Sequence, residues 1–146
     1  MAKQVCVFAE NKPGRLERIA RILKDADINI RATTIATSQG FGVIKLIVQS
    51  PEQTIELLQQ NGLTAYSREI IDVLMIDQRG GLHAIAEAFS GKDINVEDAC
   101  GFVIQNGKQA VMVFDVEGIP DRDFYYLIGV TVCNDTQIHH SFWADH

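Results

Sequence analysis

The apolar residues follow two patterns along the chain, one typical of strands and one typical of helices, and the alternation between them predicts the secondary structure. Short runs rich in apolar and β-branched residues are typical of strands. Residues recurring every three or four positions are typical of one face of a helix. We expect strands at residues 4–9, 28–37, 43–48, 63–70, 71–76, 94–104 and 109–116, and helical stripes formed by Leu16, Ile19, Ala20, Leu23 and Ala26, and by Leu82, Ile85, Ala86 and Phe89.

Local signals place the ends of the helices. Ser50-Pro51-Glu52-Gln53 is a helix start, because its serine can cap, its proline suits the first turn and its glutamine completes a capping box. Asn61-Gly62 ends that helix, and Gly91 ends the helix that carries the second stripe. We expect a further helix over residues 121–128.

The chain also repeats itself. Residues 5–33 match residues 71–99 at an offset of 66 positions, through a helix, a turn and the start of a strand. Two unrelated helices would not match so far, so we interpret the pattern as a duplication. The aligned pairs include Gly14 with Gly80, Leu16 with Leu82, and Asp27-Ile28-Asn29 with Asp93-Ile94-Asn95.

Each repeat has the order β-α-β-β-α-β, which predicts an α+β fold. We expect two ferredoxin-like repeats, residues 1–70 and 71–146, forming antiparallel sheet with the helices on one face. Residues 118–146 match the first repeat poorly. No linker separates the repeats, because Ile70-Ile71 lies inside continuous strand-like sequence. Since small open sheets leave exposed edges, we also expect a homodimer.

Composition and charge exclude several classes of protein. The 146 residues are 47% hydrophobic, as in globular proteins, and no apolar run reaches the length of a membrane span. Thirteen basic against 19 acidic residues give a net charge of −6, which disfavours nucleic-acid binding. Three scattered cysteines and no secretory signal indicate a cytoplasmic protein.

The segment Glu10-Asn11-Lys12-Pro13-Gly14-Arg15-Leu16 resembles the opening of the ACT domain family, small ferredoxin-like modules that sense amino acids and regulate metabolism. Residues 77–82 resemble the same motif. Asn11 and Asn29 are 18 residues apart, as are Asp77 and Asn95. The ligand-holding asparagines of the serine-sensing regulatory domain of phosphoglycerate dehydrogenase lie at similar places. The resemblance covers residues 4–70 and 71–117.

The chemistry of a free amino acid suits this motif. The start of a helix offers unpaired N–H groups to a carboxylate, and glycine there allows a close approach. An asparagine amide can contact both ends of the zwitterion, and the Asp77 carboxylate suits an ammonium. The resemblance implies ligand-binding residues Asn11, Lys12, Pro13, Gly14, Arg15, Leu16, Asn29 and Ile30 in the first repeat, and Asp77, Gln78, Arg79, Gly80, Gly81, Leu82, Asn95 and Val96 in the second.

Two arrangements of these residues are open. Asn11 and Asn29 can reach one pocket, or, because ligands of the resembled family sit between paired units, Asn11 of one repeat can face Asn95 of another. The alternative to any ligand site is that both motifs are plain turns, since Pro and Gly suit turns by themselves.

No pattern in the chain is typical of a catalytic site, so we expect a non-catalytic amino-acid-binding regulator without cofactor or metal. Its expected partner is a free amino acid. The alternative function is a regulatory subunit that docks a metabolic enzyme, similar to the small subunit of acetolactate synthase. A third hypothesis is a metal-responsive protein using the C-terminal residues Cys133, His139, His140, Asp145 and His146.

Overall fold

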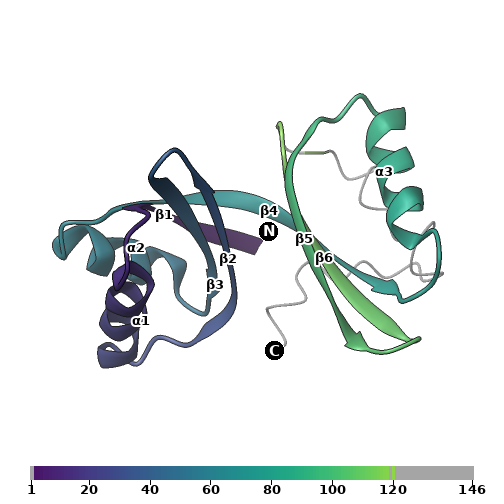
Figure 1. Ribbon diagram of the computed structural model, residues 1–146. Helices are drawn as coiled ribbons and strands as arrows, with labels where there is room; N and C mark the ends of the chain where they lie inside the picture. Colours follow the sequence, from purple (N-terminus) through teal and green to yellow (C-terminus); the bar gives the residue numbers. More distant parts are fainter. Residues whose placement is uncertain (1, 119, 121–146) are drawn as a thin grey trace. The chain divides into compact units, whose positions relative to one another are not determined.

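The computed structural model describes residues 2–118 and Pro120 of the chain (Figure 1). It divides into two compact units, each described here by itself. The N-terminal unit is Lys3–Arg68, and the second unit comprises Ala2 and the described residues from Glu69 onward. The division falls inside strand β4 (Thr64–Ile76), which begins in one unit and ends in the other. The repeat boundary expected after Ile70 stays a prediction.

The N-terminal unit follows the expected β-α-β-β-α-β order. Its strands lie in the order β2-β3-β1-β4, and β3 pairs antiparallel with both β1 and β2. The elements before β4 are β1 (Ala2–Glu10), α1 (Arg15–Asp25), β2 (Ile30–Ser38), β3 (Phe41–Val48) and α2 (Pro51–Gln60).

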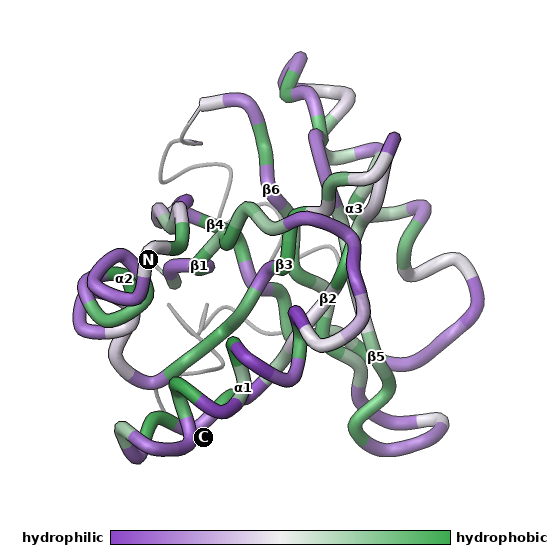
Figure 2. The backbone as a smooth tube through the Cα atoms, turned by 60° about the vertical axis from the view of Figure 1, so that its left-hand side comes forward, coloured by the Kyte–Doolittle hydropathy of each residue, from purple (hydrophilic) through white to green (hydrophobic). Residues whose placement is uncertain are grey.

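Both helices of this unit cover one face of its sheet. Alternate residues of β1 and β3 share a core with the buried faces of α1 and α2, which confirms helices on one face. Along α1 the trace changes between hydrophilic and hydrophobic residues (Figure 2), as an amphipathic helix requires. The core residues are Val5, Val7, Ala9, Ile19, Leu23, Ile28, Ile44, Leu46, Val48, Leu58 and Ala65.

The second unit repeats this layout through its third strand. After β4 come α3 (Gly81–Gly91), β5 (Val96–Gln105) and β6 (Gln109–Val116), with antiparallel pairing in the order β4-β6-β5. Phe89 of α3 meets Phe114 of β6 edge to face, with the ring centroids 5.0 Å apart. The helix expected over residues 121–128 lies outside the described residues. Helix α3 ends at Gly91, as predicted.

Helix α2 begins at the predicted proline but not with the predicted cap. The Ser50 side chain makes no capping hydrogen bond. Instead the Ser50 carbonyl accepts both the Thr54 amide at 3.0 Å and the Thr54 hydroxyl at 2.8 Å. The predicted capping box was therefore wrong, and the side chain that bonds at this helix start is that of Thr54, which donates to the Ser50 carbonyl.

Candidate functional site

The two motif turns have the same backbone. Gly14 and Gly80 precede α1 and α3 with φ of 84° and 83°, and their carbonyls accept the amides of Arg18 and Ala84 at 2.9 and 3.0 Å. A Cβ at either glycine would meet nothing within 4 Å. Glycine is therefore favoured by the left-handed conformation rather than by lack of space.

Each turn is also joined to the tip of the neighbouring hairpin. The backbone N–H of Asn11 donates to the Gly40 carbonyl at 2.8 Å, and the backbone N–H of Asp77 donates to the Lys108 carbonyl at 3.2 Å. The strand that leads into each helix is thus held to the loop between the next two strands. The duplicated sequence produces a duplicated hydrogen-bond pattern.

The side chains of Asn11 and Asp77 act differently in these equivalent places. Asp77 Oδ2 accepts the Gly107 amide at 2.7 Å, so the carboxylate adds a second bond to its hairpin tip. Asn11 is exposed, and within the described part of the chain it bonds through its backbone N–H, to the Gly40 carbonyl, and not through its side chain. The side-chain amide of Asn11 is therefore available to a ligand, whereas one oxygen of Asp77 already has a structural partner.

Charge also separates the two turns. Glu10 lies 2.7 Å from Lys12 Nζ and 3.1 Å from Arg15 Nη2, and these two cations, Lys12 foremost, lower the pKa of the Glu10 carboxyl. In the second repeat the corresponding residues are Ile76, Gln78 and Gly81. The first turn thus has two cations around the Glu10 carboxylate, whereas the second turn has uncharged residues at these three positions.

The start of α3 is packed more tightly than the start of α1. Gly81 is buried, and a Cβ there would collide with the terminal methyl of Met75. In the first repeat these positions hold Arg15 and Ala9. The Met75 side chain in the second repeat therefore favours a glycine at the first helical position, because a larger residue there would require that side chain to move.

Asn29 and Asn95 lie far from the turns of their own units. Asn11 follows Glu10, which is level with Phe41 at the hairpin end of the sheet, whereas Asn29 precedes Ile30, which is level with Val48 at the other end. The strand between these ends is roughly 26 Å long at the usual rise per residue. The expectation that Asn11 and Asn29 of one unit share a pocket was wrong, because the helix between them returns along the sheet.

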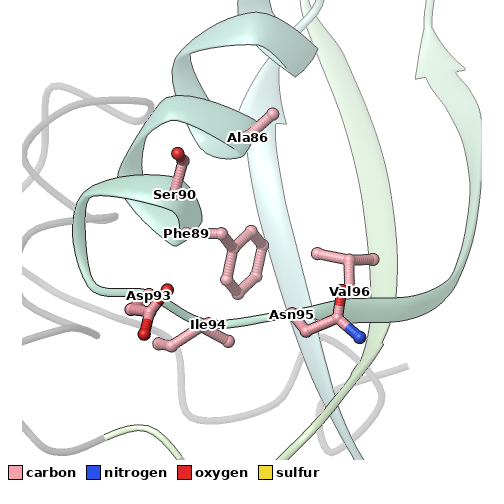
Figure 3. Close-up of a pocket in the computed structure, with 7 residues that line it drawn as sticks. All are labelled: Ala86, Phe89, Ser90, Asp93, Ile94, Asn95 and Val96. Carbon is pink, nitrogen blue, oxygen red and sulfur yellow. The ribbon is translucent and has the colours of Figure 1, made fainter.

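The strand start of the second unit does border a cavity. Asn95 and Val96, both predicted ligand residues, line a space of about 300 Å³ beside the C-terminal end of α3 (Figure 3). The Phe89 ring lies between the helix and this strand start. The other lining residues are Ala86, Ser90, Asp93 and Ile94, which the sequence did not single out as ligand contacts.

One signal in the sequence did point toward this cavity. Asp93 aligns with Asp27, and both are non-glycine residues in the left-handed region, with φ of 54° and 57°. In both repeats the next residue donates its amide to a helix carbonyl, Ile94 to Phe89 and Ile28 to Leu23. The repeated Asp-Ile-Asn triplet therefore marks the helix ends, and in the second unit all three of its residues line the cavity.

Comparison with known proteins decides the family. A family model described as an ACT domain pair matches residues 1–125. The chain belongs to the ACT domain pair family. No curated protein matches this ACT pair.

Solved structures with the same fold include regulatory proteins. Protein BT0572 from Bacteroides thetaiotaomicron is 26% identical with a TM-score of 0.73, and the match covers 80% of each chain. The ligand-free regulatory subunit of aspartate kinase from Thermus thermophilus is 13% identical with a TM-score of 0.60, over 77% of this chain and 82% of that one. A structure of aspartokinase alpha and beta subunits is 17% identical with a TM-score of 0.54, over 79% and 87%.

The described part of the ACT pair has neither a cluster of metal-ligating side chains nor a helix that could span a membrane. No group of three or more His, Cys, Asp or Glu side chains there could hold a metal ion. The histidines proposed for a metal lie outside the described residues. None of the described helices is long and apolar enough to cross a membrane.

Proposed function

We propose that this ACT pair is a non-catalytic regulatory protein that binds a free amino acid. The observation that carries the proposal is the duplicated glycine turn at the starts of α1 and α3, within a family of paired ACT domains. The regulatory subunit of aspartate kinase, which shares the fold, supports the regulatory part of the proposal.

The first turn is the stronger candidate for the ligand. The first amides of α1 have no acceptor inside the helix and lie at the positive end of its dipole, so they suit the ligand carboxylate. The exposed Asn11 amide offers a donor and an acceptor to the rest of the zwitterion. Leu16, 45% exposed, offers an apolar contact to the ligand side chain.

A second chain completes the proposed site. Asn11 and the strand-start asparagines cannot meet within one unit, because they lie at opposite ends of its sheet. We propose a homodimer in which Asn29 or Asn95 of one chain faces a turn of the other. Strands β2 and β5 each end the strand order of their unit, and exposed strand edges favour pairing with another chain.

A thermal-shift screen of the amino acids tests the function. A ligand at about 100 times its Kd adds about 2.7 kcal/mol to the free energy of unfolding, which raises the melting temperature by several degrees. A metabolite sensor is expected to have a Kd of roughly 1 µM to 1 mM, measurable by calorimetry. No response to any amino acid at several millimolar would refute the proposal.

One observation favours docking of an enzyme as a second candidate. Strand β5, which ends the strand order of its unit, exposes Val103 and Ile104 at 52% and 43%. An edge with large apolar side chains suits the addition of a strand from a partner. Affinity purification from native extract separates the candidates, because a docking subunit retains a metabolic enzyme in stoichiometric amount and a free sensor does not.

A further inference from the structure

We infer that the cavity beside α3 selects a ligand whose side chain carries a positive charge, and that Asp93 determines this specificity. The inference rests on the proposed amino-acid binding and names the ligand class for the site that contains Asn95. It follows from the cavity, from the charge at the end of α3 and from a comparison with the first repeat.

The cavity combines an apolar floor with a polar rim. Phe89 and Ile94 supply apolar surface, and Ser90, Asp93 and Asn95 supply polar groups (Figure 3). Its volume of about 300 Å³ lies at the lower end of small-molecule sites. Such a space suits an aliphatic stem that ends in a hydrogen-bonding group.

The rim is negative. It lies at the C-terminal end of α3, where the helix dipole favours cations, and the last turn of α3 has no basic residue. The Asp93 carboxylate adds a full negative charge, while Ser90 and Asn95 supply neutral acceptors. Lys92 is the nearest cation in sequence, and it is not among the residues that line the cavity.

The first repeat has a basic residue at the position that corresponds to Ser90. Ser90 aligns with Lys24, a basic residue in the last turn of α1 whose backbone carbonyl accepts the Asp27 amide at 3.0 Å. Both aspartates keep nearly the same backbone conformation. The second repeat thus retains the carboxylate but replaces the lysine with a serine that lines a cavity. A cationic ligand would supply the charge that the lysine supplies in the first repeat.

Matched ligands test the inference on the full-length protein. L-lysine and L-norleucine share an unbranched stem, but only lysine ends in an ammonium. Calorimetry is expected to show lysine binding about tenfold or more tightly, which corresponds to about 1.4 kcal/mol. Asp93→Asn is expected to remove that preference with little change in norleucine affinity. Asparagine tolerates the left-handed conformation, so this variant is expected to keep the fold.

The first repeat supplies the control variants. Asp27→Asn makes the same change in an equivalent backbone and is expected to leave the lysine preference intact. Ser90→Lys restores the residue type of the first repeat and is expected to abolish the preference, because the chain then supplies its own ammonium.

The outcomes separate the inference from the proposed function. Equal affinity for lysine and norleucine would overturn the inference and leave amino-acid binding intact. If no amino acid binds, 1,5-diaminopentane tests the cavity without any carboxylate. Binding of the diamine that Asp93→Asn weakens would support the inference alone, and no binding of the diamine would overturn it as well.

Discussion

The turns before α1 and α3 share a backbone and differ in their side chains. Both use a left-handed glycine, and both attach to a hairpin tip. The turn at Asn11 leaves its amide exposed beside two cations, whereas the turn at Asp77 uses its carboxylate to hold Gly107. The two copies therefore share the backbone conformation of the turn, whereas the side chains that a ligand would contact differ between them.

The largest effect is expected from Gly14→Val and Gly80→Val. A β-branched residue at φ near 84° is strained, so each variant is expected to lose about 1–3 kcal/mol of unfolding free energy. Because both glycines have open surroundings, the two losses are expected to be similar. Calorimetry is expected to show amino-acid binding abolished by Gly14→Val. Normal affinity in a folded Gly14→Val would place the ligand elsewhere.

Asn11→Ala and Asp77→Ala test the divergence directly. Asn11→Ala is expected to weaken ligand binding by about 1.5–3 kcal/mol, because the charged ligand loses a hydrogen bond to the Asn11 side chain. Little change in stability is expected, because this side chain is exposed. Asp77→Ala is expected to lower stability by about 1 kcal/mol, because it removes the bond to the Gly107 amide.

Denaturant unfolding and calorimetry measure the two effects of these variants, and Asp77→Asn is the conservative control. Loss of binding in Asp77→Asn without loss of stability would mean that the second turn also holds an ammonium. A folded Asn11→Ala/Asp77→Ala variant with undiminished affinity would remove both turns from the site.

A loss of stability smaller than that of the Gly14→Val and Gly80→Val variants is expected from Gly81→Ala. The added methyl collides with the end of the Met75 side chain, which is flexible, so a loss of about 1–2 kcal/mol is expected in denaturant unfolding. Met75→Leu should recover part of this loss if the collision is the cause. Arg15→Ala at the equivalent position is the control, and it is expected to change stability little, because the ion pair it removes is solvent-screened.

The smallest effect is expected from pH at Glu10. Lys12 and Arg15 depress its pKa below the ordinary 4.5. A depressed pKa stabilises the fold above the unfolded value and loses that contribution as pH falls through the folded value. Acid unfolding of Glu10→Gln is therefore expected to depend slightly less on pH below about 4.5. NMR titration of the Glu10 carboxyl checks the shift, and a pKa at or above 4.5 would contradict it.

The sequence predicted the strands and helices of the described residues and their repeated layout well, because each depends on local patterns. Gly14 and Gly80 could be predicted because the left-handed position that precedes each helix favours glycine. The hydrogen bond of Asp77 to Gly107 could not, because it joins residues 30 positions apart in a geometry that only the folded hairpin creates.

The predicted pairing of Asn11 with Asn29 failed for a related reason. The spacing of 18 residues does not reveal that the helix between Asn11 and Asn29 runs back along the sheet, so that the next strand begins at the opposite end. The cavity was missed because the repeated Asp-Ile-Asn triplet marks where the helix ends but does not reveal that the folded chain leaves a space beside it.

Strand β4 has a consequence for any attempt to separate the repeats. Its thirteen residues run without a break from one unit into the other, so no loop between the units invites a protease or tolerates an insertion there. A cut after Ile70 would create two new chain ends inside this strand, although residues 71–76 would keep their register with β6. Each half is therefore expected to be less stable alone than in the intact chain, because its part of β4 would begin or end at the cut.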